Sequence, residues 1–136
     1  MVENRGRKSR AELEVVSQDY EVIPRPKAPS DLTPDQANEW RRIVNRLPAD
    51  WFPSETHAVL AQYCRHTVAA RRVAQLIASA EEDPALDVDQ YDKLLKMQER
   101  ESRALASLGT KMRMTQQGTT THRARKGNMV KKPWEQ

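Results

Sequence analysis

Cysteine is almost absent from this sequence, because Cys64 is the only one among 136 residues. A disulfide within the chain is thereby excluded, and so is a zinc site built on pairs of cysteines. Long apolar runs are also missing: nowhere do 18 apolar residues follow one another, and residues 1–10 lack the apolar core of a secretion signal. We therefore expect a protein that stays in a reducing cytoplasm.

Glycine and apolar residues are scarce as well. The four glycines form no phosphate-binding loop, and no nucleophile elbow is present. We therefore expect no catalytic residues, no enzymatic activity and no cofactor. Apolar residues make up only 38% of the chain and charged residues 31%, so the core that one copy can bury is thin. Association with other copies of the chain is the expected consequence.

Lysine and arginine are unevenly distributed along the chain. Residues 1–29 hold six basic against five acidic side chains, residues 30–115 twelve against thirteen, and residues 116–136 five against one. A near-neutral body with a basic end suits a protein that binds a polyanion such as DNA. It suits a solvated tail without a partner equally well.

The pattern of apolar residues divides the chain into three parts. Residues 1–29 form a basic, Pro-rich arm that should be flexible or laid over a neighbour, because the three prolines from Pro24 to Pro29 favour extended backbone. Residues 30–115 form a helical oligomerisation domain. Residues 116–136 are a basic tail without any period, and we expect it to be disordered until it meets a partner.

The helical domain opens with a capping box. Thr33 caps a helix, Pro34 suits its first turn, and Gln36 completes the reciprocal pair. This predicts a short helix over residues 34–47, ended by Pro48. A second and longer helix, without Gly or Pro, is predicted from a cap at Ser54 to about residue 80.

The helix over residues 54–80 carries a seam with steps of three and four, which is typical of packing against other helices. A third helix is predicted from a cap at Asp87 or Asp89 to Leu108, with Gly109 as its C-terminal cap. The short acidic turn between the two long helices predicts an all-α fold built on an antiparallel hairpin. The predicted oligomer interface comprises Leu60, Tyr63, Thr67, Ala70, Ala74 and Ile77 of the seam, with Leu94 and Leu105 of the third helix.

The candidate binding residues are basic or belong to the tail. The DNA-binding candidates are Arg5, Arg7, Lys8 and Arg10 in the arm, Arg65, Arg71 and Arg72 on the second helix, and Arg123, Arg125, Lys126, Lys131 and Lys132 in the tail. A solvated helix face explains the three arginines of the second helix equally well. No helix-turn-helix is supported, because residues 48–53 are too long a connection.

Two smaller features have alternative interpretations. Val130 and Trp134 are apolar groups in a polar tail, which indicates either a segment that folds onto a partner or an inert tail. His57 and Cys64 lie seven residues apart on one helix face, but a closed metal site needs about four ligands. A buried thiol beside a half-exposed imidazole is favoured, and no metal is expected.

The order of these features resembles a known family. The Pro-rich lead from Pro24 to Pro29, then Leu32-Thr33-Pro34, Glu39-Trp40-Arg41-Arg42-Ile43 and Leu60-Ala61-Gln62-Tyr63-Cys64, is similar to the opening of the small terminase subunits of tailed bacteriophages. The similarity covers about residues 24–115. After Leu108-Gly109 the sequence departs from the Pro/Ser-containing turn of many relatives.

The resemblance implies a ring of about eight to twelve subunits in the host cell cytoplasm. Such a ring recognises double-stranded viral DNA and delivers it to the terminase large subunit, whose ATPase and nuclease it regulates, and Val130 and Trp134 are candidates for that contact. Two rival functions are a dimeric DNA-binding transcriptional regulator and a structural coiled-coil adaptor without affinity for DNA.

Overall fold

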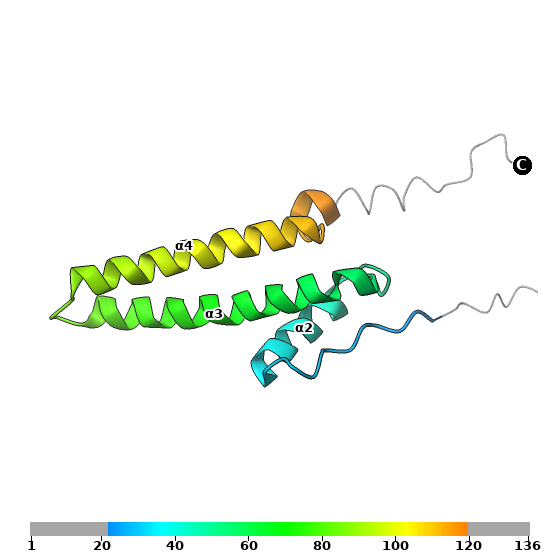
Figure 1. Cartoon of the computed structure of the whole chain (residues 1–136), viewed down its shortest axis with the longest axis horizontal. Helices are drawn as coiled ribbons and strands as arrows, with labels where there is room; N and C mark the ends of the chain where they lie inside the picture. The colour runs from blue at the N-terminus through cyan, green and yellow to red at the C-terminus, as the bar shows by residue number, and fades with distance from the viewer. Residues whose placement is uncertain (1–21, 120–136) are drawn as a thin grey trace, which may run out of the picture.

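The computed structural model describes residues 22–119, and every regular element among them is helical. In chain order these elements are α2 (Pro34–Arg46), the 3-10 turn η1 (Ser54–Thr56), α3 (His57–Glu82) and α4 (Val88–Lys111). The predicted all-α class is confirmed for this part of the chain. Figure 1 shows α3 and α4 side by side in opposite directions, with α2 against the first half of α3.

The start of α2 follows the predicted capping box. The Thr33 hydroxyl accepts a hydrogen bond from the Gln36 backbone N–H, and the Gln36 amide oxygen accepts one from the Thr33 N–H at 3.1 Å. Both bonds satisfy N–H groups that have no partner within the helix. The helix ends at Arg46, one residue before the predicted end.

The extended segment before α2 lies over that helix. The Arg25 guanidinium donates to the backbone carbonyls of Val44 and Leu47 at the C-terminal end of α2, where a positive charge complements the helix dipole. The Trp40 indole N–H donates to the Pro26 carbonyl at 3.0 Å. The described part of the arm thus packs on its own chain.

The core lies where α2 crosses α3. Trp40 of α2 is fully buried, as are Leu60 and Cys64 of α3. Phe52 and Met112 close this cluster from the connection before α3 and from the end of α4. The Trp51 indole N–H donates to the Met112 carbonyl at 3.0 Å, so the two segments are joined by a polar contact as well.

The start of α3 differs from the prediction. Ser54 does not cap the helix; it opens the turn η1, and α3 begins at His57. The Thr56 hydroxyl and the Thr56 N–H both donate to the Pro53 carbonyl, which closes the turn before the helix starts. The His57 imidazole then lies edge-on to Trp40, with ring centres 5.7 Å apart.

The row of residues predicted on α3 as the oligomer interface needs correction, because α2 and α4 of the same chain cover parts of it. Leu60 is fully buried in the core with α2, and Ile77 is buried as well, so neither offers its side chain to another copy. Ala74 is exposed, whereas Val73 is buried in its place. A single heptad row was expected, but α2 and α4 contact different sides of α3.

The end of α4 also differs from the prediction. Asp87 caps α4 as expected, by accepting from the Asp89 N–H at 3.0 Å. Gly109 does not end the helix, which continues to Lys111, and the left-handed residue that follows is Arg113 with φ 56°. Gly109 is buried, and a Cβ on it would lie 3.7 Å from the Tyr63 ring.

The two ends of the molecule are therefore packed differently. At the α2 end, the core is surrounded by α2, the first half of α3, the connection before α3 and the end of α4. The second half of α3 and the first half of α4 extend beyond α2 as two helices alone (Figure 1). We call this part the protruding half, residues 72–100. Only Val73 and Ile77 of its large apolar side chains are buried.

Replacing Gly109 by Ala should stabilise the fold by about 0.5 to 1 kcal/mol, because alanine loses less backbone entropy in a helix than glycine does. The added methyl group meets Tyr63 at an ordinary contact distance. Denaturant unfolding measures the change, with Ala106→Gly on the exposed side of α4 as the control that should destabilise by a similar amount. A destabilised Gly109→Ala variant would show that the Tyr63 contact tolerates no side chain.

Candidate interaction surfaces

Two of the three arginines predicted on α3 to bind DNA form ion pairs within the chain. Arg65 lies 2.6 Å from the Asp31 carboxylate, and Arg71 lies 2.6 Å from the Glu39 carboxylate. Both pairs join α3 to α2 or to the segment before it. Part of the positive charge expected on this helix is thus neutralised locally.

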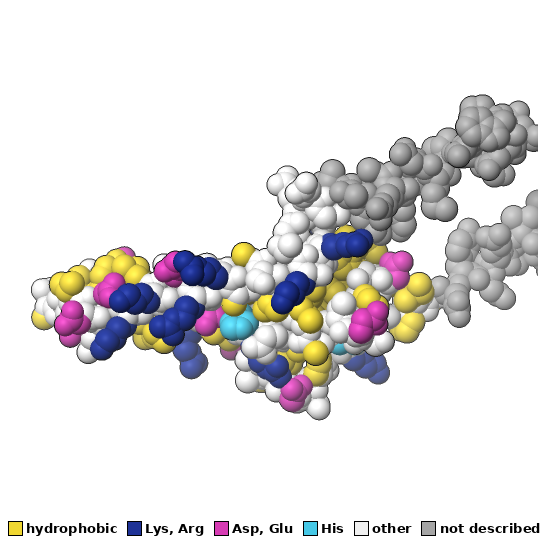
Figure 2. All heavy atoms as spheres, turned by 45° about the horizontal axis from the view of Figure 1, so that its top comes forward, with side chains coloured by type: hydrophobic (Ala, Val, Ile, Leu, Met, Phe, Trp, Pro, Cys, Tyr) yellow, Lys and Arg dark blue, Asp and Glu magenta, His cyan; other side chains and the backbone are white. Residues whose placement is uncertain are grey.

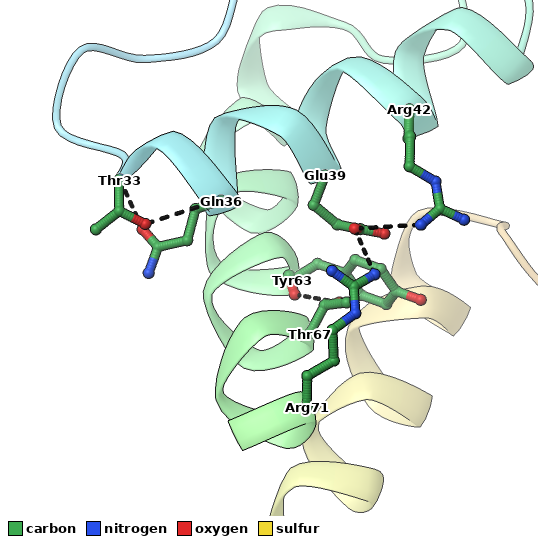
Figure 3. A network of polar contacts seen from close by, with 7 residues as sticks. All are labelled: Thr33, Gln36, Glu39, Arg42, Tyr63, Thr67 and Arg71. Atoms are coloured by element: carbon green, nitrogen blue, oxygen red, sulfur yellow. Dashed lines mark hydrogen bonds and ion pairs between the residues drawn. The ribbon is translucent and has the colours of Figure 1, made fainter. Parts of the chain in front are cut away.

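The Glu39 pair is the more enclosed of the two. Glu39 is 8% exposed and is the only charged residue buried among residues 22–119. Its carboxylate accepts from Arg71 and lies 3.6 Å from the Arg42 guanidinium of the next turn, as Figure 3 shows. A carboxylate held in this way needs its cations, because an unpaired charge is costly to remove from water. Arg71 therefore holds α2 on α3.

Arg72, in contrast, is exposed and forms no ion pair with the described residues. It is the one arginine of the predicted trio whose charge stays available to a partner. The remaining DNA-binding candidates (Arg5, Arg7, Lys8, Arg10, Arg123, Arg125, Lys126, Lys131 and Lys132) lie outside the described residues, as do Val130 and Trp134.

His57 and Cys64 do not form a metal site. His57 Nε2 lies 3.0 Å from the Phe52 carbonyl, and Cys64 is fully buried. Burial, followed by the nearby Glu39 charge, raises the pKa of the Cys64 thiol to about 12, so it remains protonated. Among residues 22–119 no three His, Cys, Asp or Glu side chains are grouped as metal ligands would be.

A polar contact joins α3 to α4 near the middle of the molecule. His66 Nδ1 lies 2.6 Å from the Glu101 carboxylate, and both side chains are half-buried between the helices. At the far end, the Tyr91 hydroxyl donates to Glu81 at 2.7 Å, which raises the pKa of Tyr91. These contacts fix the register of the two helices along the protruding half.

The protruding half exposes large apolar side chains. Leu76 is 48% exposed on α3, while Met97 is 44% and Leu95 39% exposed on α4. Leu86 and Val88 are exposed at the turn between the helices. Several exposed large apolar groups on a thin two-helix segment indicate surfaces that another protein covers.

A row of basic residues on α4 was missed by the sequence analysis. Lys93, Lys96, Arg100 and Arg103 follow one another at steps of three, four and three, which places them along one side of α4. Lys96, Glu99, Arg100 and Arg103 line an open hollow there. Figure 2 shows the dark blue side chains spread along the protruding half. The step pattern was the available signal for this row.

Comparisons with family models, with curated proteins and with solved structures found no match to this chain. Among the described residues no helix is both long and apolar enough to span a membrane. The function is therefore inferred from the exposed apolar and basic residues of α3 and α4.

Replacing Arg71 by Ala should destabilise the fold by about 1 kcal/mol, because the buried Glu39 carboxylate loses its nearest cation while Arg71 itself is half-exposed. Arg72→Ala is the matched control and should change the free energy of unfolding by less than about 0.5 kcal/mol. Thermal and denaturant unfolding of both variants make the comparison. Equal effects would mean that the Glu39 pair contributes nothing to the packing of α2.

Proposed function

We propose that this protein is a non-catalytic, oligomeric DNA-binding adaptor of the kind that small terminase subunits provide in viral genome packaging. The observation that carries the proposal is the protruding half, where two helices alone expose Leu76, Leu95 and Met97. Covering these groups with further copies of the chain would supply the apolar burial that one copy lacks.

The DNA-binding part of the proposal rests on the chain ends. The five basic side chains among residues 116–136 are opposed by one acidic side chain, and such segments neutralise phosphates with release of counterions. Binding by each copy should be weak and tolerant of sequence. In a ring, many copies reach one duplex, and their effective concentration multiplies the affinity.

The remaining steps follow the resemblance of residues 24–115 to small terminase subunits. The ring would pass DNA to the large subunit and alter its ATP hydrolysis, with Val130 and Trp134 as the contact. The chain would itself neither hydrolyse ATP nor cut DNA.

The full chain should form a closed oligomer in solution. Light scattering should give a mass several times the 15.7 kDa of one chain. Leu76→Gln with Met97→Gln should release single chains without loss of helix content, since both side chains are exposed in one copy. Val22→Ser with Ile23→Ser, which removes exposed apolar groups elsewhere, is the control that should keep the mass.

The measured mass separates the candidate functions. A single chain at all concentrations would overturn the adaptor proposal. A dimer that binds a short palindromic site would favour the transcriptional regulator. A large assembly without affinity for DNA, even at low salt, would favour the structural adaptor.

Affinity for DNA should fall steeply with salt, and each lost phosphate contact should lower the slope of log affinity against log salt by about one unit. Replacing Arg123, Arg125 and Lys126 by Ala should lower that slope more than replacing Arg65 and Arg72, because Arg65 is paired with Asp31. Gel-shift titrations at several salt concentrations, on variants of unchanged mass, measure both slopes. A tail variant that binds like the native protein would reverse this ranking of the sites.

A further inference from the structure

The two flanks of the protruding half differ in charge. They adjoin on the outer side of α4, where Glu99 of one flank and Arg100 of the other line the same open hollow. The contact rows between the helices, Val73 and Ile77 on α3 and Leu94 on α4, lie midway between the two flanks.

The Tyr91 hydroxyl donates to the Glu81 carboxylate across the gap between the two helices. The side of α3 that carries Glu81 therefore lies beside the side of α4 that carries Tyr91. Residues three and four positions apart then continue each flank along its helix.

The flank that contains the Tyr91 bond is acidic. From Glu81 the row on α3 continues back through two alanines, and from Tyr91 the row on α4 continues through Leu95 to Glu99. We define the acidic face as Ala74, Ala78 and Glu81 of α3 with Asp92, Leu95 and Glu99 of α4. Its three charged groups are carboxylates, and its centre is the exposed Leu95. The same rows continue to two cations, Arg71 on α3 and Arg103 on α4.

The other flank is basic. Arg72 and Leu76 lie four apart on α3, while Lys93, Met97 and Arg100 lie at steps of four and three on α4. We define the basic face as these five residues. Three of the charged groups on these rows are cations, and Asp89, four residues before Lys93, adds a carboxylate. Between the cations lie the exposed Leu76 and Met97.

The charges of the basic face have no partner within the described chain. Among residues 22–119, Arg72, Lys93 and Arg100 form no ion pair. The carboxylates of the acidic face do have intrachain contacts, from Tyr91, Lys96 and Arg103, but these are exposed pairs at the surface. Exposed pairs of this kind contribute little and leave the carboxylates able to bind a second cation.

We infer that the basic face of one copy packs on the acidic face of the next. The contact would bury Leu76 and Met97 against Leu95 and the two alanines, with cations and carboxylates opposed around them. This inference rests on the proposed function, since it names the faces through which the oligomer forms. The occupant of each face is a second copy of the same chain, because each face offers the charge and the apolar centre that the other lacks.

The charge arrangement selects one symmetry over another. A twofold dimer through identical faces would place Arg72, Lys93 and Arg100 against themselves, or the three carboxylates against themselves, and like charges in contact are unfavourable. A head-to-tail contact opposes unlike charges instead. Such a contact repeats from copy to copy and closes into a ring when its rotation permits.

Two charge-reversed variants test the inference. Lys93→Glu with Arg100→Glu makes both faces acidic, and Asp92→Lys with Glu99→Lys makes both faces basic. Each variant alone should have the mass of a single chain in light scattering. An equimolar mixture should assemble again by alternation, because each variant now offers what the other needs, and it should regain the native mass where the number of copies is even. A chain with all four changes should regain it alone.

The control has the same change in net charge on α2. Arg41→Glu with Arg46→Glu, at two exposed arginines, leaves both faces of the protruding half intact and should keep the native mass, while circular dichroism shows whether each variant stays helical. Reversed variants that remain assembled would overturn the inference and leave the oligomeric adaptor standing. So would monomeric variants that do not reassemble when mixed.

Two further outcomes separate the inference from the proposed function. A native chain that is monomeric in the same experiment would overturn both. If Lys93→Glu with Arg100→Glu kept the native mass but lost binding to a DNA duplex, the basic face would bind nucleic acid instead of a neighbouring copy.

Discussion

The burial of Trp40 is the interaction on which the rest of the described structure depends. Its indole fills the space between α2 and α3, its N–H is satisfied by the Pro26 carbonyl, and its ring meets the edge of His57. Because the segment around Pro26, α2 and the start of α3 all contact this one side chain, their positions are fixed together. Leu60 and Cys64 complete the same cluster, and Arg71 and Glu39 close it at the surface.

Local signals predicted much of the fold, and tertiary contacts account for what was missed. Thr33 and Gln36 identified the start of α2 because capping involves residues three apart. Ala74 was misplaced because a heptad row assumes one partner, whereas α3 has two. Gly109 was misread as a helix end because its packing under Tyr63, far away in sequence, is invisible locally. The basic face was missed because its residues come from two helices, and only the register of α3 and α4 brings them together.

The contrast between the two ends of the molecule connects the fold to its proposed role. The α2 end encloses a core of its own, while the protruding half leaves apolar and charged groups in water. One chain therefore holds a self-sufficient part and a part whose burial is incomplete. Natural monomers rarely keep such a surface uncovered, which is the physical reason to look for the oligomer along α3 and α4.

Cys64 makes the packing of α2 observable from outside. The thiol is enclosed by the same residues that hold Trp40, and its raised pKa keeps the reactive thiolate scarce at neutral pH. A thiol reagent reaches it only when α2 lifts from α3. The rate at which Cys64 is labelled therefore measures how often α2 separates from α3. Because Cys64 is the only thiol, opening of the protruding half does not contribute to this rate.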